Sequence, residues 1–442
     1  MANQASSEPA SEISSAARRA FPGVQSIRRT FTSFSNRNYR LYFIGQLLSS
    51  IGTWVSRIAQ AWLVLQITNS AFALGLVGTL QFLPLTALSL FGGVFADRFP
   101  KRRLLVVTQS VMAMQSLVLA LLVFTGVVQI WHIYVLAMIL GLASAFDNPT
   151  RQAFVSEMVG KESLPNAIAL NSSLFNTARI IGPAIGGALI AWFSISVPFF
   201  LDAVSYLAVI VCLLLMRPAE FHDVPAPTHG PVLARIAEGI RYATRTPDVA
   251  VVLIIMAFIG TFGYNFTTIL PLIAKYVVDT GALGFGSLLT AMGFGSLCAA
   301  LSMAYMSRPS EKVLLVASVG FALLLGLLAI SHIYLLTILI LIVLGFSSIS
   351  FTATANSRLQ LFAPGELRGR VMSIYIFLNM GTAPLGNFLI GWLGETYSVT
   401  ISVLVMAILC GIGVALGFFY LARHPHSSRT VPAAVKRPAP GD

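Results

Sequence analysis

Polar side chains follow one helix face within an otherwise apolar stretch, residues 39–67. The spacings are four, three, four and three, through Gln46, Ser50, Thr53, Arg57 and Gln60. This periodicity forms a single stripe on an α-helix. An arginine in such surroundings needs a wet cavity or a negatively charged partner. We therefore expect Arg57 to bind a carboxylate, either of a substrate in a cavity or of Asp202 in a structural pair.

Two further apolar stretches carry polar residues at the same spacing. Residues 165–193 present Ser172, Asn176, Arg179 and Pro183. Residues 370–394 present Tyr375, Asn379, Thr382 and Gly386. Arg179, one turn from Asn176, could grip an anion or hold its helix against the eighth one, and both interpretations stay open. A third group could line a substrate cavity or serve packing alone: Phe82, Thr261, Tyr264, Asn265 and Thr268.

Two carboxylates in apolar surroundings suggest proton or gate chemistry. Asp202 is the acidic residue placed clearly within an apolar stretch, and because burial favours a neutral carboxyl group it is a possible proton carrier. Its alternative is a structural ion pair near the outer interface. Asp147 ends another stretch, and we expect it to pair with Arg151 across a helix break at residues 148–149, as a gate or helix-end feature.

A short charged connection separates two long apolar runs at residues 93–103. Its chemically important members are Gly93, Asp97, Arg98, Arg102 and Arg103. A small residue such as Gly93 allows close approach of a neighbouring membrane helix. The arginines also serve as topology signals. We expect this loop to control how helices meet.

These residues need membrane helices to position them. The chain is 56% hydrophobic and 10% charged, with a mean hydropathy of +0.82, so water cannot be its main solvent. A crossing takes about 20 helical residues, and no alternating barrel pattern is present. Twelve spans are predicted, at 39–67, 71–96, 104–126, 131–150, 165–193, 197–216, 249–276, 281–306, 313–332, 334–356, 370–394 and 399–421.

The basic residues predict the orientation. Apart from Arg57, Arg179 and Lys275, every Lys and Arg falls in the tails or the even-numbered connections. The positive-inside rule therefore places both termini in the cytoplasm. The pI near 10 follows from this topology, and no nucleic-acid partner is expected. Three cysteines lie within apolar spans, so we expect neither a disulfide framework nor a metal site.

The longest internal connection divides the spans into six and six. We expect a disordered basic cytoplasmic tail at 1–37 without a cleaved signal, a linker with an amphipathic helix on the inner membrane surface at 217–248, and a second tail at 423–442. Two six-helix bundles, 38–216 and 249–422, lie between them. Similar charged loops 210 residues apart, and glycine pairs 204 residues apart, indicate a duplicated unit.

The loop at 93–105 resembles the signature of the major facilitator superfamily between helices two and three. The fifth-helix residues Gly182, Pro183, Gly186 and Gly187 resemble the core of the motif of drug–proton antiporters. The stretches 45–68 and 147–154 look like the enterobactin-exporter branch, which includes macrolide efflux proteins. The resemblance covers about residues 36–422. It implies the twelve-helix, all-α fold of this superfamily and favours export over uptake.

The resemblance also carries a mechanism and a departure from it. It implies that Asp97 sits near the N-terminal end of helix eleven, beside Arg368 or Arg370, as a conformational latch. The fourth-helix motif of antiporters has Arg and Gln where this chain has Ala137 and Leu140. Proton transfer by a fourth-helix arginine therefore does not carry over, and any coupling uses other residues.

The sequence thus predicts an exporter of a siderophore or an amphipathic drug in a bacterial inner membrane. It would work by alternating access, in exchange for protons, as a monomer in contact with lipid. Alternatives are a nutrient importer of the same fold and a transport-inactive receptor or assembly partner. No enzyme is expected, because a phosphate-binding loop, a histidine ligand pair and a nucleophile elbow are missing from the sequence. No cofactor is expected beyond the proton gradient.

Overall fold

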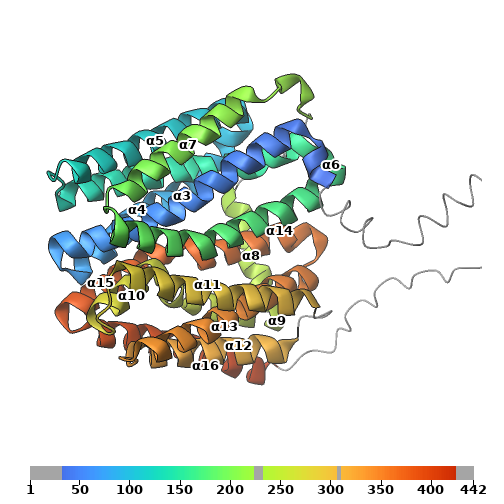
Figure 1. Ribbon diagram of the computed structural model, residues 1–442. Helices are drawn as coiled ribbons and strands as arrows, with labels where there is room; N and C mark the ends of the chain where they lie inside the picture. The colour runs from blue at the N-terminus through green and yellow to red at the C-terminus, as the bar shows by residue number, and fades with distance from the viewer. Residues whose placement is uncertain (1–31, 223–231, 306–309, 425–442) are drawn as a thin grey trace, which may run out of the picture.

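A computed structural model describes residues 32–222, 232–305 and 310–424 as a bundle of long helices (Figure 1). Side chains at 89–94, 96, 97, 161, 232–236, 304 and 305 lie outside this description. The described residues contain helices and no strand. In lipid this is one of the arrangements that satisfies backbone hydrogen bonds within each segment.

The N-terminal half, from α3 to α7, holds the first six predicted spans. A short η1 (Thr32–Ser35) precedes it, and its helices are α3 (Arg37–Thr68), α4 (Ala71–Arg98), α5 (Lys101–Phe124), α6 (Ile130–Trp192) and α7 (Val197–Leu215). Helix α6 carries spans four and five, which are separated at Gly160 by a non-helical backbone with φ of 68°. That positive φ suits glycine.

The helix break expected at residues 148–149 is wrong. Helix α6 runs through Pro149, and side-chain bonds bridge this turn. Arg151 Nε donates to Asp147 Oδ2 at 3.0 Å, and Thr150 Oγ1 donates to Phe146 O at 2.7 Å. Proline removes one backbone donor, and these bonds help to keep the turn helical. The chain instead reverses at Gly160.

The connection between the halves includes η2 (Pro218–Glu220) and α8 (Val232–Arg245). Helix α8 is bent by 112° from the helix that follows it, so it lies across the bundle end. Its buried face, with Gly239 and Ala243, contacts the C-terminal half. Tyr242 Oη donates to Phe362 O at 2.8 Å. The amphipathic face therefore packs on protein.

The C-terminal half has two spans with a π-helical turn inside. The seventh comprises α9 (Pro247–Phe258), η3 (Ile259–Gly263) and α10 (Phe266–Tyr276). The eleventh comprises α14 (Gly365–Ile376), η4 (Phe377–Gly381) and α15 (Ala383–Thr396). The others are α11 (Ala282–Tyr305), α12 (Glu311–Ala329), α13 (Tyr334–Phe362) and α16 (Val399–Arg423).

A helix occupies each predicted span within the described residues. Within the part of the chain that the structure describes, ten helical segments are long and apolar enough to cross a membrane, or up to eleven if the bent pair of α8 and α9 counts as one span. Helix α3 is 32 residues long but falls short on apolarity, because its stripe includes Arg57 and Gln60. The seventh span is divided between α9 and α10.

The two halves meet through α4 against α15 and α6 against α11. A Cβ on Gly75 of α4 would lie 2.7 Å from the Cα of Gly391. A Cβ on Gly286 of α11 would lie 3.1 Å from the Cα of Gly187. Small residues allow this close backbone approach between membrane helices. The predicted duplication therefore appears as two equivalent helix crossings.

The bundle has two chemically different ends. Both described termini lie at the same end of the bundle (Figure 1), and by the order of the helices the charged turn after α4 and helix α8 belong to this basic end. The far end carries the connection Asn69–Ser70 and the turns at 125–129, 193–196, 277–281, 330–333 and 397–398. The pocket described next lies between the halves, lined by α3, α4 and α10.

Candidate functional site

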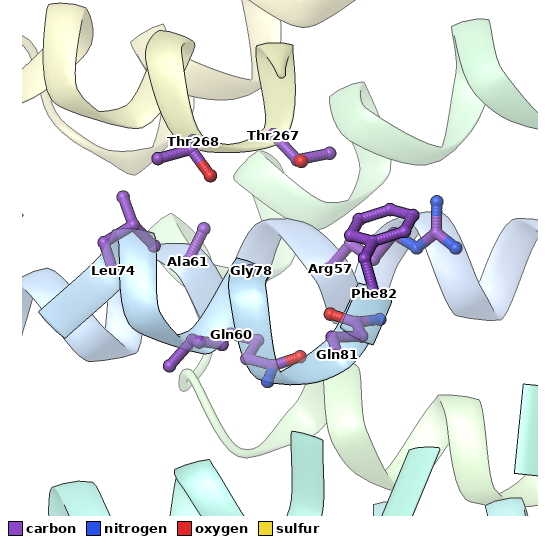
Figure 2. Close-up of a pocket in the computed structure, with 10 residues that line it drawn as sticks. Arg57, Gln60, Ala61, Leu74, Gly78, Gln81, Phe82, Thr267 and Thr268 are labelled. Carbon is purple, nitrogen blue, oxygen red and sulfur yellow. The ribbon is translucent and has the colours of Figure 1, made fainter. Parts of the chain in front are cut away.

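A pocket opens between the two halves where α3 and α4 face α10 (Figure 2). Its cavity volume is about 40 Å³, well below the ~300–1,000 Å³ of typical small-molecule sites, so it is a narrow cleft between the halves. Both polar and apolar side chains line it, from Arg57, Gln60, Ala61, Leu74, Val77, Gly78, Gln81, Phe82, Thr267 and Thr268.

Two polar atoms of this wall lack a protein partner within the described structure. Arg57 Nε and Gln60 Nε2 are buried and make no hydrogen bond. The Arg57 guanidinium lies 5.1 Å from the centre of the Trp54 ring, a cation–π contact. Buried donors are nearly always satisfied by protein, water or ligand. The pocket is therefore suited to a ligand with acceptor groups.

A buried carboxylate stands behind Arg57. Asp202 of α7 is 4% exposed, and its Oδ2 accepts from Ser116 Oγ of α5 at 3.0 Å. Its Oδ1 has no hydrogen-bond partner within the described structure. Asp202 interacts electrostatically with Arg57 without a direct ion pair. Both interpretations of Asp202, a proton carrier and a structural ion pair, stay predictions.

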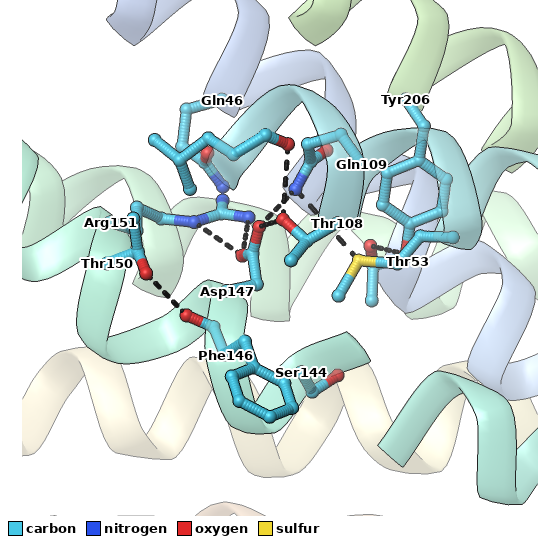
Figure 3. A network of polar contacts seen from close by, with 12 residues as sticks. Gln46, Thr53, Thr108, Gln109, Ser144, Phe146, Asp147, Thr150, Arg151 and Tyr206 are labelled. Carbon is cyan, nitrogen blue, oxygen red and sulfur yellow. Dashed lines mark hydrogen bonds and ion pairs between the residues drawn. The ribbon is translucent and has the colours of Figure 1, made fainter. Parts of the chain in front are cut away.

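A second buried carboxylate is fully engaged (Figure 3). Asp147 of α6 is 1% exposed. It accepts from Thr108 Oγ1 and Gln109 Nε2 of α5, each at 2.8 Å, and forms an ion pair with Arg151. The predicted pairing with Arg151 is present. All these residues belong to the N-terminal half, so the cluster joins α5 to α6.

The C-terminal half presents neutral groups to the same region. Thr268 Oγ1 donates to Asn387 Oδ1 at 2.7 Å, which links α10 to α15. Tyr264 Oη is 2.7 Å from Thr352 Oγ1, and Asn265 Nδ2 donates to Thr261 O at 2.7 Å. Tyr264 and Asn265, predicted to line a cavity, are therefore bonded inside their own half.

The other residues predicted for a cavity lie apart from the pocket wall. Gln46 Nε2 donates to Ser50 Oγ at 3.2 Å and lies beside Arg151 (Figure 3). Thr53 Oγ1 is 3.2 Å from Tyr206 Oη. Asn176 is exposed, and its Nδ2 bonds to Ser172 O at 2.9 Å.

Asn379 and Arg179, also predicted for the substrate cavity, lie elsewhere in the bundle. Asn379 stands in the π-helical turn η4, where its Nδ2 contacts Met256 Sδ at 3.5 Å. Arg179 is partly buried on α6, next to the α11 crossing at Gly293. The described structure gives the Arg179 side chain no hydrogen bond or ion pair. Its two interpretations, an anion grip or a helix contact, remain predictions.

The motif glycines sit at helix crossings. Gly182 faces Trp54 of α3, Gly186 faces Val55 and Ile58, and Gly187 faces α11. Pro183 lies inside α6 and presents its carbonyl to Gly286. These contacts place the motif where span five meets both its own half and the other one.

The charged loop is described in part. Arg102 Nε and Nη2 donate to Leu213 O at 2.6 Å and Leu214 O at 2.9 Å, which caps the end of α7. Arg98 and Arg103 are exposed. The surroundings of Gly93 and the side chain of Asp97 lie outside the described part of the structure. Arg370, one expected partner of Asp97, forms an ion pair with Glu238 of α8 at 2.5 Å.

Sequence reasoning missed four polar contributors: Gln81, Ser116, Gln109 and Asn387. Gln81 and Asn387 stand singly in apolar spans, and Gln109 and Ser116 belong to the short polar runs 108–110 and 115–116. A polar residue in a membrane helix was the available signal, because such residues bond across helices. Their partners could be found only once the helix rotations were known.

Comparison with known proteins identifies the class. Residues 28–439 match the model of a family described as transmembrane secretion effector. The staphyloferrin A transporter of Staphylococcus aureus is 26% identical, over 87% of this chain and 96% of that protein. The multidrug efflux pump Tap of Mycolicibacterium fortuitum is 27% identical, over 83% and 92%. The enterobactin exporter EntS of Shigella flexneri is 23% identical, over 80% and 85%.

Solved structures show the same fold. A bacterial homologue of the human lysosomal transporter Spinster aligns with a TM-score of 0.67 at 12% identity, covering 87% of this chain and 96% of that one. A POT family transporter aligns with a TM-score of 0.71 at 11% identity, over 88% and 97%. The helices form the major facilitator fold. The chain belongs to the transmembrane secretion effector family of that superfamily, a family of membrane transporters and not of enzymes.

Proposed function

We propose that this transporter exports a small organic molecule, a siderophore or an amphipathic drug, across the inner membrane by alternating access. The observation that carries the proposal is the pocket between the halves, whose wall includes unpartnered donors of Arg57 and Gln60. Phe82 and Leu74 add apolar surface. Relatives that transport a siderophore or pump out drugs support this substrate range.

The substrate is best matched by a molecule with a carboxylate or similar acceptor. Arg57 presents a planar fork that can hold such a group in two places, and its Nε is unoccupied in protein contacts. A neutral amphipathic drug would use the apolar wall and the Gln60 amide. A siderophore with acceptor groups therefore fits the arginine more fully.

Protons are proposed as the counter-transported ion, with Asp202 as the carrier. A protonatable group must change its partners during the cycle, and the unbonded Oδ1 of Asp202 leaves room for a proton. Asp147, in contrast, is held by three side chains. Arg57 lies next to Asp202 and to the pocket, so substrate and proton would compete through it.

The remaining assignments concern placement. We propose that the basic end faces the cytoplasm, as the positive-inside rule predicts, and that the chain acts as a monomer among lipids. Asp97 is proposed as a latch of the basic end. Cysteines introduced at Gln129 and Thr280 should react with an impermeant reagent in intact cells, and one at Pro100 should not. Labelling at Pro100 would reverse the orientation.

Intracellular accumulation tests the function. A deletion strain should accumulate enterobactin or a macrolide from a substrate panel more than the parent strain, and a protonophore should abolish the difference. Asp202→Asn should remove the dependence on the proton gradient at equal expression, and Asp97→Asn should slow efflux strongly. Equal accumulation in both strains across the panel would refute export. Lower accumulation in the deletion strain would favour the nutrient importer.

A further inference from the structure

The far end of the bundle is held together by side chains that reach from one half to the helix ends of the other. Helices α3 and α4 are joined there by the two-residue connection Asn69–Ser70. This hairpin end is bonded on one side by α10 and on the other by α15. Both α10 and α15 belong to the C-terminal half.

On one side, α10 binds the C-terminal end of α3. Lys275 Nζ donates to Leu65 O at 2.6 Å. The neighbouring Tyr276 Oη donates to Asn69 O at 2.8 Å. Leu65 O also accepts from the cap residue, Asn69 N, at 3.1 Å, and the carbonyls at the C-terminal end of a helix carry the negative end of its dipole. A lysine from the opposite half therefore meets complementary charge.

On the other side, α15 binds the N-terminal end of α4. Glu395 Oε2 accepts from Ser70 Oγ at 2.9 Å and from Phe72 N at 3.2 Å. Ser70 is also the N-cap residue of α4, accepting from Ala73 N at 3.1 Å. The first amides of a helix carry the positive end of its dipole, which favours a carboxylate. The two charges thus match the two helix ends in sign.

The placement of charge along the chain makes these two residues unusual. Lysine and arginine otherwise stand at the basic end or inside spans, and the far end has only Lys275, Asp279 and Glu395 as charged side chains. Two of these three bind the opposite half. Between the described side chains, the hydrogen bonds that join the two halves at an end of the bundle lie at the far end.

We propose that Lys275 and Glu395 form the outer gate of the transport cycle, closing the far end by capping α3 and α4 from the opposite half. The proposal rests on alternating access across the pocket. The far end can open only when both caps are released to water. Each cap resembles a charge at a helix terminus, so its loss should favour opening by about two- to fivefold.

Thiol labelling in intact cells tests the gate without a substrate. In a background with Cys212, Cys298 and Cys410 replaced by Ala, Val77→Cys reports from the pocket wall, where Val77 is 4% exposed. A membrane-impermeant methanethiosulfonate should label it slowly. Lys275→Met or Glu395→Gln should each speed labelling about two- to fivefold, and together by about the product.

Matched variants separate the gate from general damage. Asp279→Asn removes the third far-end charge, which makes no described hydrogen bond or ion pair, and should leave the rate unchanged; asparagine tolerates its φ of 53°. Lys275→Arg should keep the parent rate. Tyr276→Phe tests the same side with minimal change in shape and should accelerate labelling.

A second measurement does not depend on reagent access. Spin labels at Thr125 and Tyr397, on opposite halves of the far end, should show more of the long distance in the Lys275→Met and Glu395→Gln proteins. Unchanged labelling and unchanged distances in folded variants would overturn the gate. A shifted gate in a protein that exports nothing from the panel would keep the gate and refute export.

Discussion

The two halves of this transporter share a helix plan but differ in chemistry. The N-terminal half buries Asp147 and Asp202, with the partly buried Arg151 and Arg57 beside them, on helices that run without a π turn. The C-terminal half fills the corresponding depth with hydroxyl and amide groups, and its spans seven and eleven each contain a π-helical turn. Its buried charge, Arg358, lies at the basic end.

The buried carboxylates and the π-helical turns thus lie in different halves. π turns within helices occur frequently at functional sites, and η3 and η4 pack against each other through Gly260. Charge, in contrast, gathers behind the pocket in the other half. The N-terminal half therefore supplies the buried carboxylates, and the C-terminal half supplies the π-helical turns.

The halves remain equivalent in how their helices cross. Gly182 faces Trp54, and Gly386 faces Thr261. Extending this correspondence by one turn matches Arg57 with Tyr264. Arg57 keeps a free donor at the pocket, whereas Tyr264 bonds to Thr352. Variants at corresponding positions can therefore test whether charge or position matters.

The largest effect is expected where a buried carboxylate that holds several partners is removed. Asp147→Ala should lower the free energy of unfolding by about 3–5 kcal/mol, because Arg151 loses its ion-pair partner and Thr108 and Gln109 lose their acceptor inside the bundle. Thermal unfolding in detergent measures this. Asp248→Ala at the corresponding end of the other half should cost less, because Arg358 keeps Glu311 at 3.7 Å. Equal losses would remove the distinction between the halves.

A smaller effect is expected on transport from the pocket arginine. Arg57→Ala should reduce efflux of an anionic substrate at least about tenfold, or about 1.4 kcal/mol, and Arg57→Lys should retain part of the activity because it keeps a point charge. Tyr264→Phe, at the corresponding place, should retain most of it. Initial efflux rates of the three variants at matched expression measure these differences. Wild-type rates for Arg57→Ala would mean that the polar stripe of α3 is only a hydrated helix face, without a role in substrate binding.

The smallest effect is expected from the neutral pair of the C-terminal half. Thr268→Val removes one hydrogen bond to Asn387 and should cost about 1 kcal/mol. Thr267→Val is the control, because Thr267 lines the same pocket and makes no described hydrogen bond. Melting temperatures of the two proteins give the comparison. A loss as large as that of Asp147→Ala would contradict it.

Much of the fold could be predicted because hydropathy and charge report directly on membrane spans. The spacing of Asp147 and Arg151 likewise predicted their pair, since residues four apart share a helix face. The rotation of each helix about its own axis could not be predicted from the sequence. Tyr264 therefore turned out to bond within its half, while Asn387 and Ser116 gained partners on other helices.

Local backbone chemistry was misread in one place. Pro149 suggested a break, yet the chain turns at Gly160, where a positive φ is required. Proline removes a backbone donor and its ring crowds the carbonyl one turn back, yet α6 stays helical there, with the side-chain bonds of Thr150 and Arg151 across the same turn. The role of the charged loop was predicted by resemblance alone, and its central carboxylate, Asp97, stays a prediction.

The attachment points of the central connection limit how far the two halves can separate at the basic end. His222 N donates to Glu157 O at 2.8 Å, which ties the chain after α7 to the turn of α6. On the other side, Glu238 of α8 is tied to Arg370. Fifteen residues, 223–237, separate these anchors, and fully extended this stretch would reach about 55 Å. The length of the connection therefore sets an upper limit on how far the two anchors can separate at the basic end.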